Sequence, residues 1–281
     1  MDTMNPIGVF DSGVGGLTVA SEIMKQLPNE RIIYFGDTAR VPYGNKSQKT
    51  IIKYSKQIVN FLLEKKVKAI VIACNTASAL ALDEIKAQVS VPVIGVVEPG
   101  AKAAASVTKN NNIGIIGTKG TISSGIYQHL LSKSNPEVSV YGKACPLFVP
   151  LVEEGWINDP ITFDVARRYL DDFMELDIDT LVLGCTHYPL LRETIDAVLE
   201  KRVNLVNPAF ETAKTLGQVL VSKGLFSHKL SVNHEFYVSD GVDHFNAFAN
   251  GILPHYLKDA KEINIDDYSD VISGEMIWQK M

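Results

Sequence analysis

The chain has 281 residues, of which 46% are hydrophobic and 21% are charged, and its formal net charge is −5. A chain of this length can bury a substantial core, and its apolar content excludes an intrinsically disordered protein. The mild negative charge argues against a general nucleic-acid binder, because such proteins carry a basic face.

Short β-branched runs alternate with longer amphipathic stretches along most of the chain. Taken in chain order, continuous apolar runs predict buried strands at 7–10, 32–35, 69–73, 93–97, 113–116 and 180–183. Such runs are typical of strands covered on both faces, as in a parallel sheet. Residues 48–65 place their apolar side chains on roughly one helical face. Strand, helix and strand in this order favour an α/β fold with right-handed crossovers.

The second half of the chain repeats parts of the first half. Residues 7–13 resemble 113–119, and residues 71–76 resemble 182–187 at a similar offset. Two matches in similar register suggest two related α/β halves. The last stretch, around 236–238, has no third copy and is expected to fold back onto the first half.

We therefore predict two similar parallel-sheet α/β domains related by pseudo-symmetry, with the active site between them. The first domain comprises residues 1–97 together with 206–281, because the chain is expected to return to it at its C-terminal end. The second domain comprises residues 98–205. The length of the chain is sufficient for two such halves to close over one small molecule.

The chain contains three cysteines, Cys74, Cys145 and Cys185. They are too few and too widely spaced for a disulfide framework or a CxxC site, and a sparse, odd set favours a reducing compartment. The first residues show no signal-peptide pattern, and no apolar run approaches the roughly 20 residues that a membrane-spanning helix needs. We expect a cytoplasmic protein that does not enter a membrane.

Cys74 and Cys185 each directly follow a predicted strand and precede a polar residue and a predicted helix. In open α/β sheets, ligands bind at the carboxyl ends of strands, where helix N-termini favour thiolates. A single cysteine at such a position is more often a small buried hydrophobe. Two cysteines at matching positions of two similar halves favour a functional pair, whereas Cys145 has no counterpart and is predicted to serve packing.

Two facing thiols are too alike to be a nucleophile and its base, which normally combine cysteine with histidine. A symmetric pair suits a symmetric reaction, in which one thiolate removes a proton from a carbon while the opposite thiol delivers one to its other face. That reaction is racemisation or epimerisation by two bases. The ordinary thiol pKa, about 8.5, needs only small shifts to reach working pH.

Polar residues beside these strand ends predict where a ligand is held. The loop 11–16 is rich in glycine and leads into a predicted helix, so it can hold a phosphate or a carboxylate. It has neither the P-loop pattern nor the GxGxxG spacing, which disfavours dinucleotide binding. Taken alone, the polar side chains here are equally well explained as helix caps. These are Asp11, Asn75, Thr76, Thr186 and His187.

His187 lies two positions after Cys185, a spacing that allows it to tune or relay the proton of that thiol. Residues 42–47 form a turn-rich stretch that, by itself, indicates a surface connection more than a binding loop. The other histidines form no metal-spaced cluster, so no metal is expected.

Four segments carry a highly specific combination of motifs, at 8–18, 36–44, 73–77 and 183–191. In them the chain resembles the glutamate racemase family of the aspartate/glutamate racemase superfamily, from residue 7 to about 191. The resemblance implies racemisation of L-glutamate to D-glutamate without cofactor, by two cysteines, supplying D-glutamate for peptidoglycan in a bacterial cytoplasm. It also implies a homodimer, with no nucleic-acid or membrane partner.

The resemblance further implies roles for individual residues. Cys74 and Cys185 would be the acid/base thiols, with Asp11 assisting on the side of Cys74. His187 and Glu153 would assist on the side of Cys185. Contacts to the substrate would come from Asp11, Ser12, Tyr43, Gly44, Asn75, Thr76, Thr118, Thr121, Thr186 and His187. None of these positions is an arginine, which suggests that neutral donors carry much of the recognition.

The chain departs from the family at Asn207, where aspartate is more frequent, and this position is expected to affect only local packing. Three alternative functions stay open. An aspartate racemase or related isomerase would keep both thiols but change the donors to the substrate side chain. A cysteine amidohydrolase would use one thiol and release ammonia. A non-catalytic amino-acid-binding or regulatory protein would bind its ligand and turn nothing over.

Overall fold

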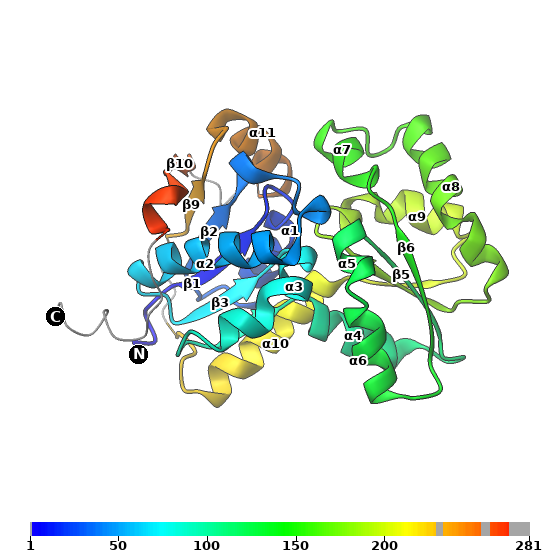
Figure 1. Cartoon of the computed structure of the whole chain (residues 1–281), viewed down its shortest axis with the longest axis horizontal. Coiled ribbons are helices and arrows are strands. Elements are labelled where there is room, and N and C mark those ends of the chain that lie inside the picture. Colours follow the sequence, from blue (N-terminus) through cyan, green and yellow to red (C-terminus); the bar gives the residue numbers. More distant parts are fainter. Residues whose placement is uncertain (1, 229–232, 254–258, 270–281) are drawn as a thin grey trace.

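The computed structural model describes residues 2–228, 233–253 and 259–269, which form two α/β units lying side by side (Figure 1). The described strands make two sheets, one in each unit, and every neighbouring pair of strands runs parallel. Within the described residues, no helix is long and apolar enough to span a membrane.

The first sheet has six strands in the order β10-β9-β2-β1-β3-β4. Their bounds are β1 (Ile7–Asp11), β2 (Ile32–Gly36), β3 (Ala69–Ile72), β4 (Val93–Gly95), β9 (Glu235–Val238) and β10 (Lys261–Glu262). β9 pairs with β2, with Glu235 opposite Ile33, so the end of the chain returns to the first sheet.

The second sheet has four strands in the order β6-β5-β7-β8. Their bounds are β5 (Asn112–Gly117), β6 (Ser139–Ala144), β7 (Thr180–Gly184) and β8 (Asn204–Val206). This order repeats the β2-β1-β3-β4 part of the first sheet, which makes β1 and β3 the counterparts of β5 and β7. The predicted α/β class with two similar parallel sheets is therefore confirmed. The division of the chain at 97/98 and 205/206 stays a prediction.

Helices cover both faces of the first sheet, which explains its continuous apolar runs. In β1, Ile7 and Val9 pack on the face covered by α1 (Leu17–Gln26), α10 (Pro208–Ser222) and α11 (Val242–Ile252). Phe10 lies on the opposite face, which is covered by α2 (Gln48–Glu64) and α3 (Asn75–Lys86). Successive side chains of one strand thus enter different cores.

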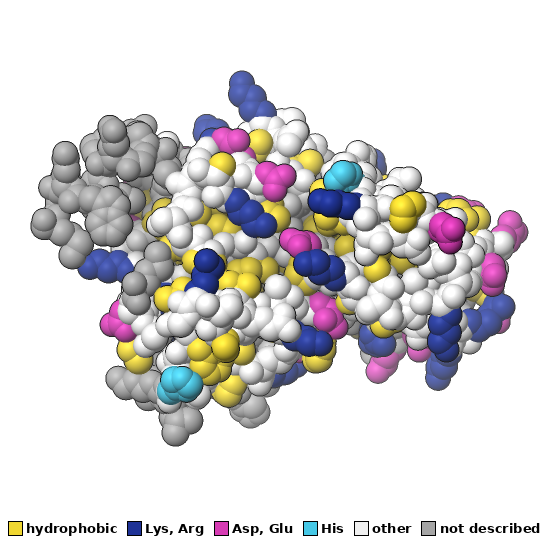
Figure 2. Space-filling view, turned by 90° about the horizontal axis from the view of Figure 1, so that it is seen from below, with side chains coloured by type: hydrophobic (Ala, Val, Ile, Leu, Met, Phe, Trp, Pro, Cys, Tyr) yellow, Lys and Arg dark blue, Asp and Glu magenta, His cyan; other side chains and the backbone are white. Residues whose placement is uncertain are grey.

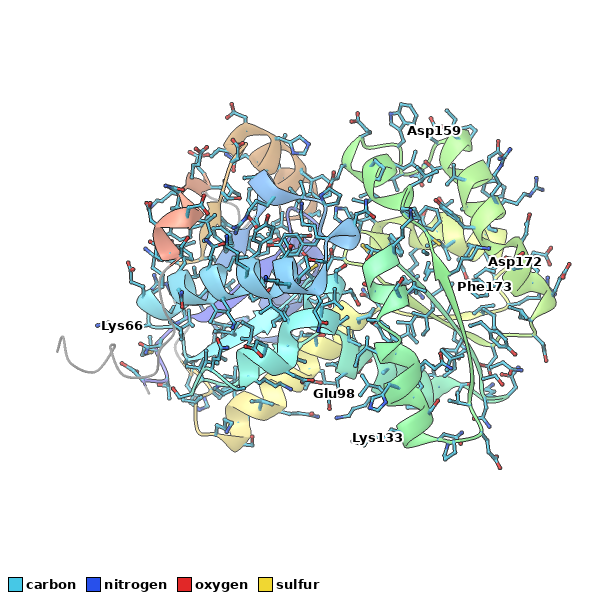
Figure 3. The ribbon with its side chains drawn as sticks, in the orientation of Figure 1. Lys66, Glu98, Lys133, Asp159, Asp172 and Phe173 are labelled. Carbon is cyan, nitrogen blue, oxygen red and sulfur yellow. The ribbon has the colours of Figure 1, made fainter. Side chains whose placement is uncertain are left out.

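The second sheet is built in the same way. Ile113 and Ile115 face α4 (Val97–Val107) and α6 (Ile126–Ser134), while Ile116 faces α7 (Phe148–Glu153), α8 (Pro160–Glu175) and α9 (Arg192–Val198). Helix α8 is amphipathic: Phe173 packs into this core, whereas its neighbour Asp172 is exposed and pairs with Lys143 (Figure 3). The short helix α5 (Lys119–Ser123) follows β5.

Several strands differ from the sequence prediction. The strand expected at 93–97 ends at Gly95, because α4 already begins at Val97. Strand β6 was not predicted, because it lies at the edge of its sheet and its side chains are only partly buried. Strands β8 and β10 were also missed, because they are short edge strands whose side chains are mostly exposed, so neither has a continuous apolar run.

Charged side chains of both signs are scattered over the face seen from below, between small apolar areas (Figure 2). Among the described residues on this face, Lys and Arg side chains form no continuous basic stripe of the kind that binds nucleic acid.

Candidate active site

The carboxyl ends of strands from both sheets meet at one cavity of about 350 Å³. Residues from both units line it, and Cys74 and Cys185 both reach it. Of the other predicted site residues, those in the lining are Ser12, Tyr43, Gly44, Asn75, Thr76, Thr118, Glu153, Thr186 and His187. Asp11 and Thr121 do not line the cavity, and both are buried behind it.

Cys74 is the N-cap residue of α3, and its Sγ accepts a hydrogen bond of 3.5 Å from the backbone N–H of Ala77. Its thiol lies 3.7 Å from Ser12 Oγ. Burial raises the pKa of Cys74 to about 12, and the negative charge of Asp11 adds to this rise. The backbone N–H of Ala77 at the start of α3 lowers the pKa of Cys74, in the direction expected from the sequence, but desolvation and Asp11 outweigh this effect in the free protein. Cys74 carries its proton there.

Asp11 ends β1 and is fully buried. It does not cap α1, whose N-cap is Gly16; instead its Oδ2 accepts a 3.0 Å hydrogen bond from the N–H of Gly13. Burial raises the pKa of Asp11, and the positive charge of His187 and nearby N–H groups oppose the rise. The charges of Asp11 and His187 therefore interact, although the two residues come from different units.

Cys185 directly follows β7, but no α-helix begins there; a 3₁₀ helix at Tyr188–Leu191 precedes α9. The sulfur of Cys185 lies 3.8 Å from Nδ1 of His187, and Nε2 of His187 lies 3.0 Å from Oε1 of Glu153. Burial opposes protonation of His187, but its bonds to Cys185 and Glu153 outweigh burial and raise the pKa of His187 to about 10. A cationic imidazole thus lies between the sulfur and the carboxylate at neutral pH.

This shift gives a testable pH dependence. The folded pKa of His187, about 10, lies above the ordinary value of 6.5, so the folded protein holds this proton more tightly. The resulting stability is fully present below pH 6.5 and is lost as the pH rises towards 10. We expect the ¹⁵N resonances of the His187 ring to show a doubly protonated imidazole at pH 8. A His187 ring that titrates near its ordinary pKa would contradict this assignment.

Hydrogen bonds between small hydroxyl and amide groups at the start of α3 connect the two units. Thr76 Oγ1 lies 2.8 Å from Thr118 Oγ1, and Thr118 caps α5 by accepting from the N–H of Thr121. Asn75 Oδ1 accepts a 2.8 Å hydrogen bond from the Tyr127 hydroxyl. These neutral donors and acceptors are present at the predicted contact positions. Tyr127 was missed because nothing in the sequence relates it to Asn75.

The segment 42–47 is not a simple surface connection, because its first four residues, 42–45, form a wall of the cavity. Tyr43 is 1% exposed, and its hydroxyl donates to the buried carboxylate of Asp37. Arg40 Nε donates to the same carboxylate at 2.8 and 2.9 Å. Asp37 and Arg40 were not predicted as site residues, although both lie in the specific segment 36–44.

Replacing Tyr43 by Phe removes a donor from the buried Asp37 carboxylate. We expect the free energy of unfolding to fall by about 1.5–3 kcal/mol, as for hydrogen bonds to charged groups. The KM should rise more than kcat falls, because the wall that carries Gly44 loosens. Urea unfolding and steady-state kinetics check both effects. Tyr54→Phe is the matched control, because Tyr54 packs against Tyr43 at a ring-centroid distance of 5.8 Å and so changes the same neighbourhood while the Tyr43 hydroxyl stays in place.

Apolar residues complete the cavity wall, among them Val41, Pro146 and Val149.

Cys145 is fully buried in the core of the second unit, and its thiol donates to the Lys143 carbonyl. Within the described part of the chain, no group of three His, Cys, Asp or Glu side chains is placed to hold a metal ion.

The profile of the Asp/Glu/hydantoin racemase family matches residues 7–215. A glutamate racemase from Geobacter metallireducens is 48% identical over 261 residues, covering 92% of this chain and 97% of that protein. The solved glutamate racemase RacE1 of Bacillus anthracis has a TM-score of 0.89 at 41% identity, covering 92% of this chain and 97% of its own. A Francisella tularensis glutamate racemase, solved in complex with D-glutamate, has a TM-score of 0.89 at 40% identity and covers 95% of this chain and 100% of its own.

Proposed function

The chain belongs to the Asp/Glu/hydantoin racemase family and is an amino-acid racemase. We propose that it interconverts L- and D-glutamate with Cys74 and Cys185 as its acid/base pair. One observation carries the proposal: two thiols line one cavity from equivalent strand ends of two similar sheets. One sulfur, as thiolate, takes the α-proton, and the other, as thiol, gives a proton to the opposite face of the carbon. Each turnover therefore consumes no net proton.

The two sulfur atoms have different surroundings, and this supports different roles for them in the conversion of L-glutamate to D-glutamate. Burial and Asp11 keep the proton on Cys74, so this thiol is the acid before substrate binds. His187 carries positive charge beside the sulfur of Cys185, which stabilises an anion there, and Glu153 holds the imidazole in place. Cys185 is then the base, and the two residues exchange roles in the reverse direction.

The substrate carries two carboxylates, and neutral donors are available to bind them. Ser12, Asn75, Thr76, Thr118 and Thr186 line the cavity with hydroxyl or amide groups. Such groups, fixed in a site that excludes much water, stabilise the charge that develops on the carboxylate as the α-proton leaves. Tyr43 and Gly44 form the facing wall, and Asp11 and Thr121 support the site from behind it.

Chiral chromatography of L-glutamate incubated with the pure protein tests the function. Formation of D-glutamate, approaching equal amounts of both enantiomers, is the expected result. Release of ammonia would indicate an amidohydrolase, and binding without turnover would indicate a non-catalytic protein. The same assay with aspartate tests the aspartate racemase alternative, which no contact in the cavity specifically favours.

We further propose that the product supplies peptidoglycan synthesis in a bacterial cytoplasm and that the protein works as a homodimer. The relatives support the reaction. The role in the cell and the homodimer go beyond that reaction and are proposals of their own. Rescue of a bacterial strain that requires D-glutamate tests the first point. Sedimentation of the pure protein over a range of concentrations tests the second.

A further inference from the structure

The first turn of α1, in the first unit, contacts the loop of the second unit that carries the dyad of Cys185 and His187. The hydroxyl of Thr18 lies 3.0 Å from the carbonyl oxygen of Thr186, and Thr18 is buried. We propose that Thr18 and Gly15 are positioning residues that hold this dyad in its catalytic geometry when the two units close. The proposal rests on the proposed function, because the dyad is the base of that reaction.

Thr18 has two acceptors but only one hydroxyl proton. Its Oγ1 lies 2.9 Å from the carbonyl oxygen of Gly15, at the start of its own helix, and 3.0 Å from that of Thr186, in the other unit. The hydroxyl can therefore bond to Thr186 when the units are closed and to Gly15 when they separate. Because the Thr18 hydroxyl has an acceptor in both states, its bond to Thr186 favours one arrangement of the units, and its loss on opening leaves no buried donor unpaired.

Gly15 lies against the imidazole of His187. A Cβ atom at this position would be 2.4 Å from His187 Cε1 and from Thr186 Oγ1, and 2.5 Å from His187 Nδ1. Atoms do not approach this closely without displacement, so the absent side chain makes room for the ring. Nδ1 is also the atom that faces the Cys185 sulfur.

The imidazole is consequently held from both units. Glu153, from the second unit, bonds to Nε2, while Gly15 and Phe248 of the first unit lie beside the ring, Phe248 at a centroid distance of 6.4 Å. The Thr18 bond fixes the peptide next to His187. The contacts that join the two units at this point are thus the same contacts that surround the base.

The test compares Thr18→Val, which removes the hydroxyl at nearly constant volume, with Thr18→Ser, which keeps it. We expect kcat/KM to fall about tenfold in Thr18→Val, the loss of one hydrogen bond, and to return to within about threefold of the native value in Thr18→Ser. Racemisation has an equilibrium constant of one, so the values for L- and D-glutamate must fall equally.

Thr212→Val is the matched control. Thr212 is a buried helical threonine whose hydroxyl bonds to the Pro208 carbonyl at 2.7 Å, away from the cavity. We expect it to lose stability as Thr18→Val does but to keep native kcat/KM. Equal activity losses in Thr18→Val and Thr212→Val, or no loss in Thr18→Val, would overturn the proposal. Failure of Thr18→Ser to restore activity would overturn it as well.

Gly15→Ala should have the larger effect, a loss of about 100-fold in kcat/KM, because it displaces a catalytic ring. Gly251→Ala, in α11, controls for adding a methyl group to a glycine without a clash, since a Cβ there meets no atom within 4 Å. The ¹⁵N resonances of the His187 ring give a readout independent of turnover: Thr18→Val and Gly15→Ala should shift them, and both controls should not. If the native protein does not racemise glutamate, the proposed function fails, and these resonances still decide the positioning proposal: unchanged resonances overturn it.

Discussion

Replacing either Cys74 or Cys185 by serine should lower the rate of glutamate racemisation in both directions by about 10²–10⁴-fold, the contribution of a positioned acid or base. A serine hydroxyl occupies nearly the same space as the thiol, but it does not ionise near neutral pH. Both cysteines are 6% exposed and line the same cavity, so each replacement removes the chemistry with little change in packing. Steady-state rates from each pure enantiomer measure the effect.

Cys145→Ser is the matched control for these variants. Cys145 is also a buried free cysteine, but it lies outside the cavity lining, and its thiol donates to a backbone carbonyl that a hydroxyl can also reach. Its activity should stay within about twofold of native, as expected for a residue that contacts no substrate. Near-native activity in Cys74→Ser or Cys185→Ser would end the two-base assignment.

Deuterated water separates two single-proton bases from one polyprotic base. With two opposed thiols, the product gains solvent deuterium at its α-carbon, while the remaining substrate gains little at early times. A single polyprotic base would also exchange the substrate that has not reacted. Early mass spectra of both enantiomers therefore test the pairing of Cys74 with Cys185 independently of any substitution.

The strands that could be predicted from the sequence are those covered by helices on both faces. Apolar runs such as 113–116 identify these strands because both of their faces are buried. The same rule failed at Val97, since a continuous apolar run does not separate a buried strand from the first turn of a buried helix. It also missed β6, whose partly exposed edge position leaves no continuous apolar pattern.

The site was predicted as far as its residues lie at strand ends or in specific motifs. Cys74 and Cys185 were found in this way, because equivalent strand ends of two similar halves were expected to face each other. The contacts that align them join positions far apart in the chain, as Thr18 joins Thr186, and periodicity carries no information about such pairs. The net direction of the Cys74 pKa could not be predicted for a related reason, since burial beside Asp11 is a property of the folded protein.

Lys68→Met should lower the free energy of unfolding by about 3–5 kcal/mol, because it leaves a carboxylate buried without its cation. The side chains of Lys68 and Glu30 are both 0% exposed, and Lys68 Nζ lies 2.5 Å from Glu30 Oε2. The same ammonium group donates to the carbonyl oxygens of Thr3 and Leu225, so it joins the start of the chain to the segment that follows α10. Urea unfolding measures the loss.

Glu30→Gln in the Lys68→Met background tests the reason for that loss. The glutamine side chain carries no charge but keeps an oxygen for the N–H of Ser227, which Glu30 Oε1 accepts at 2.8 Å in the native protein. We expect the double variant to be more stable than Lys68→Met alone, because the uncompensated charge is gone. A double variant that is no more stable than Lys68→Met would instead assign the loss to the bonds with Thr3 and Leu225.

Catalysis should respond differently from stability in these variants. Lys68 lies immediately before β3, whereas Cys74 lies beyond the carboxyl end of the same strand, so the ion pair and the cavity are at opposite ends of this strand. At a temperature where Lys68→Met stays folded, its kcat/KM should remain within about twofold of native, since distant sites act independently. A large loss of kcat/KM in the folded variant would mean that β3 transmits changes at its amino end to Cys74. An unchanged kcat/KM would mean that the sheet separates the residues that stabilise the fold from those that carry the reaction.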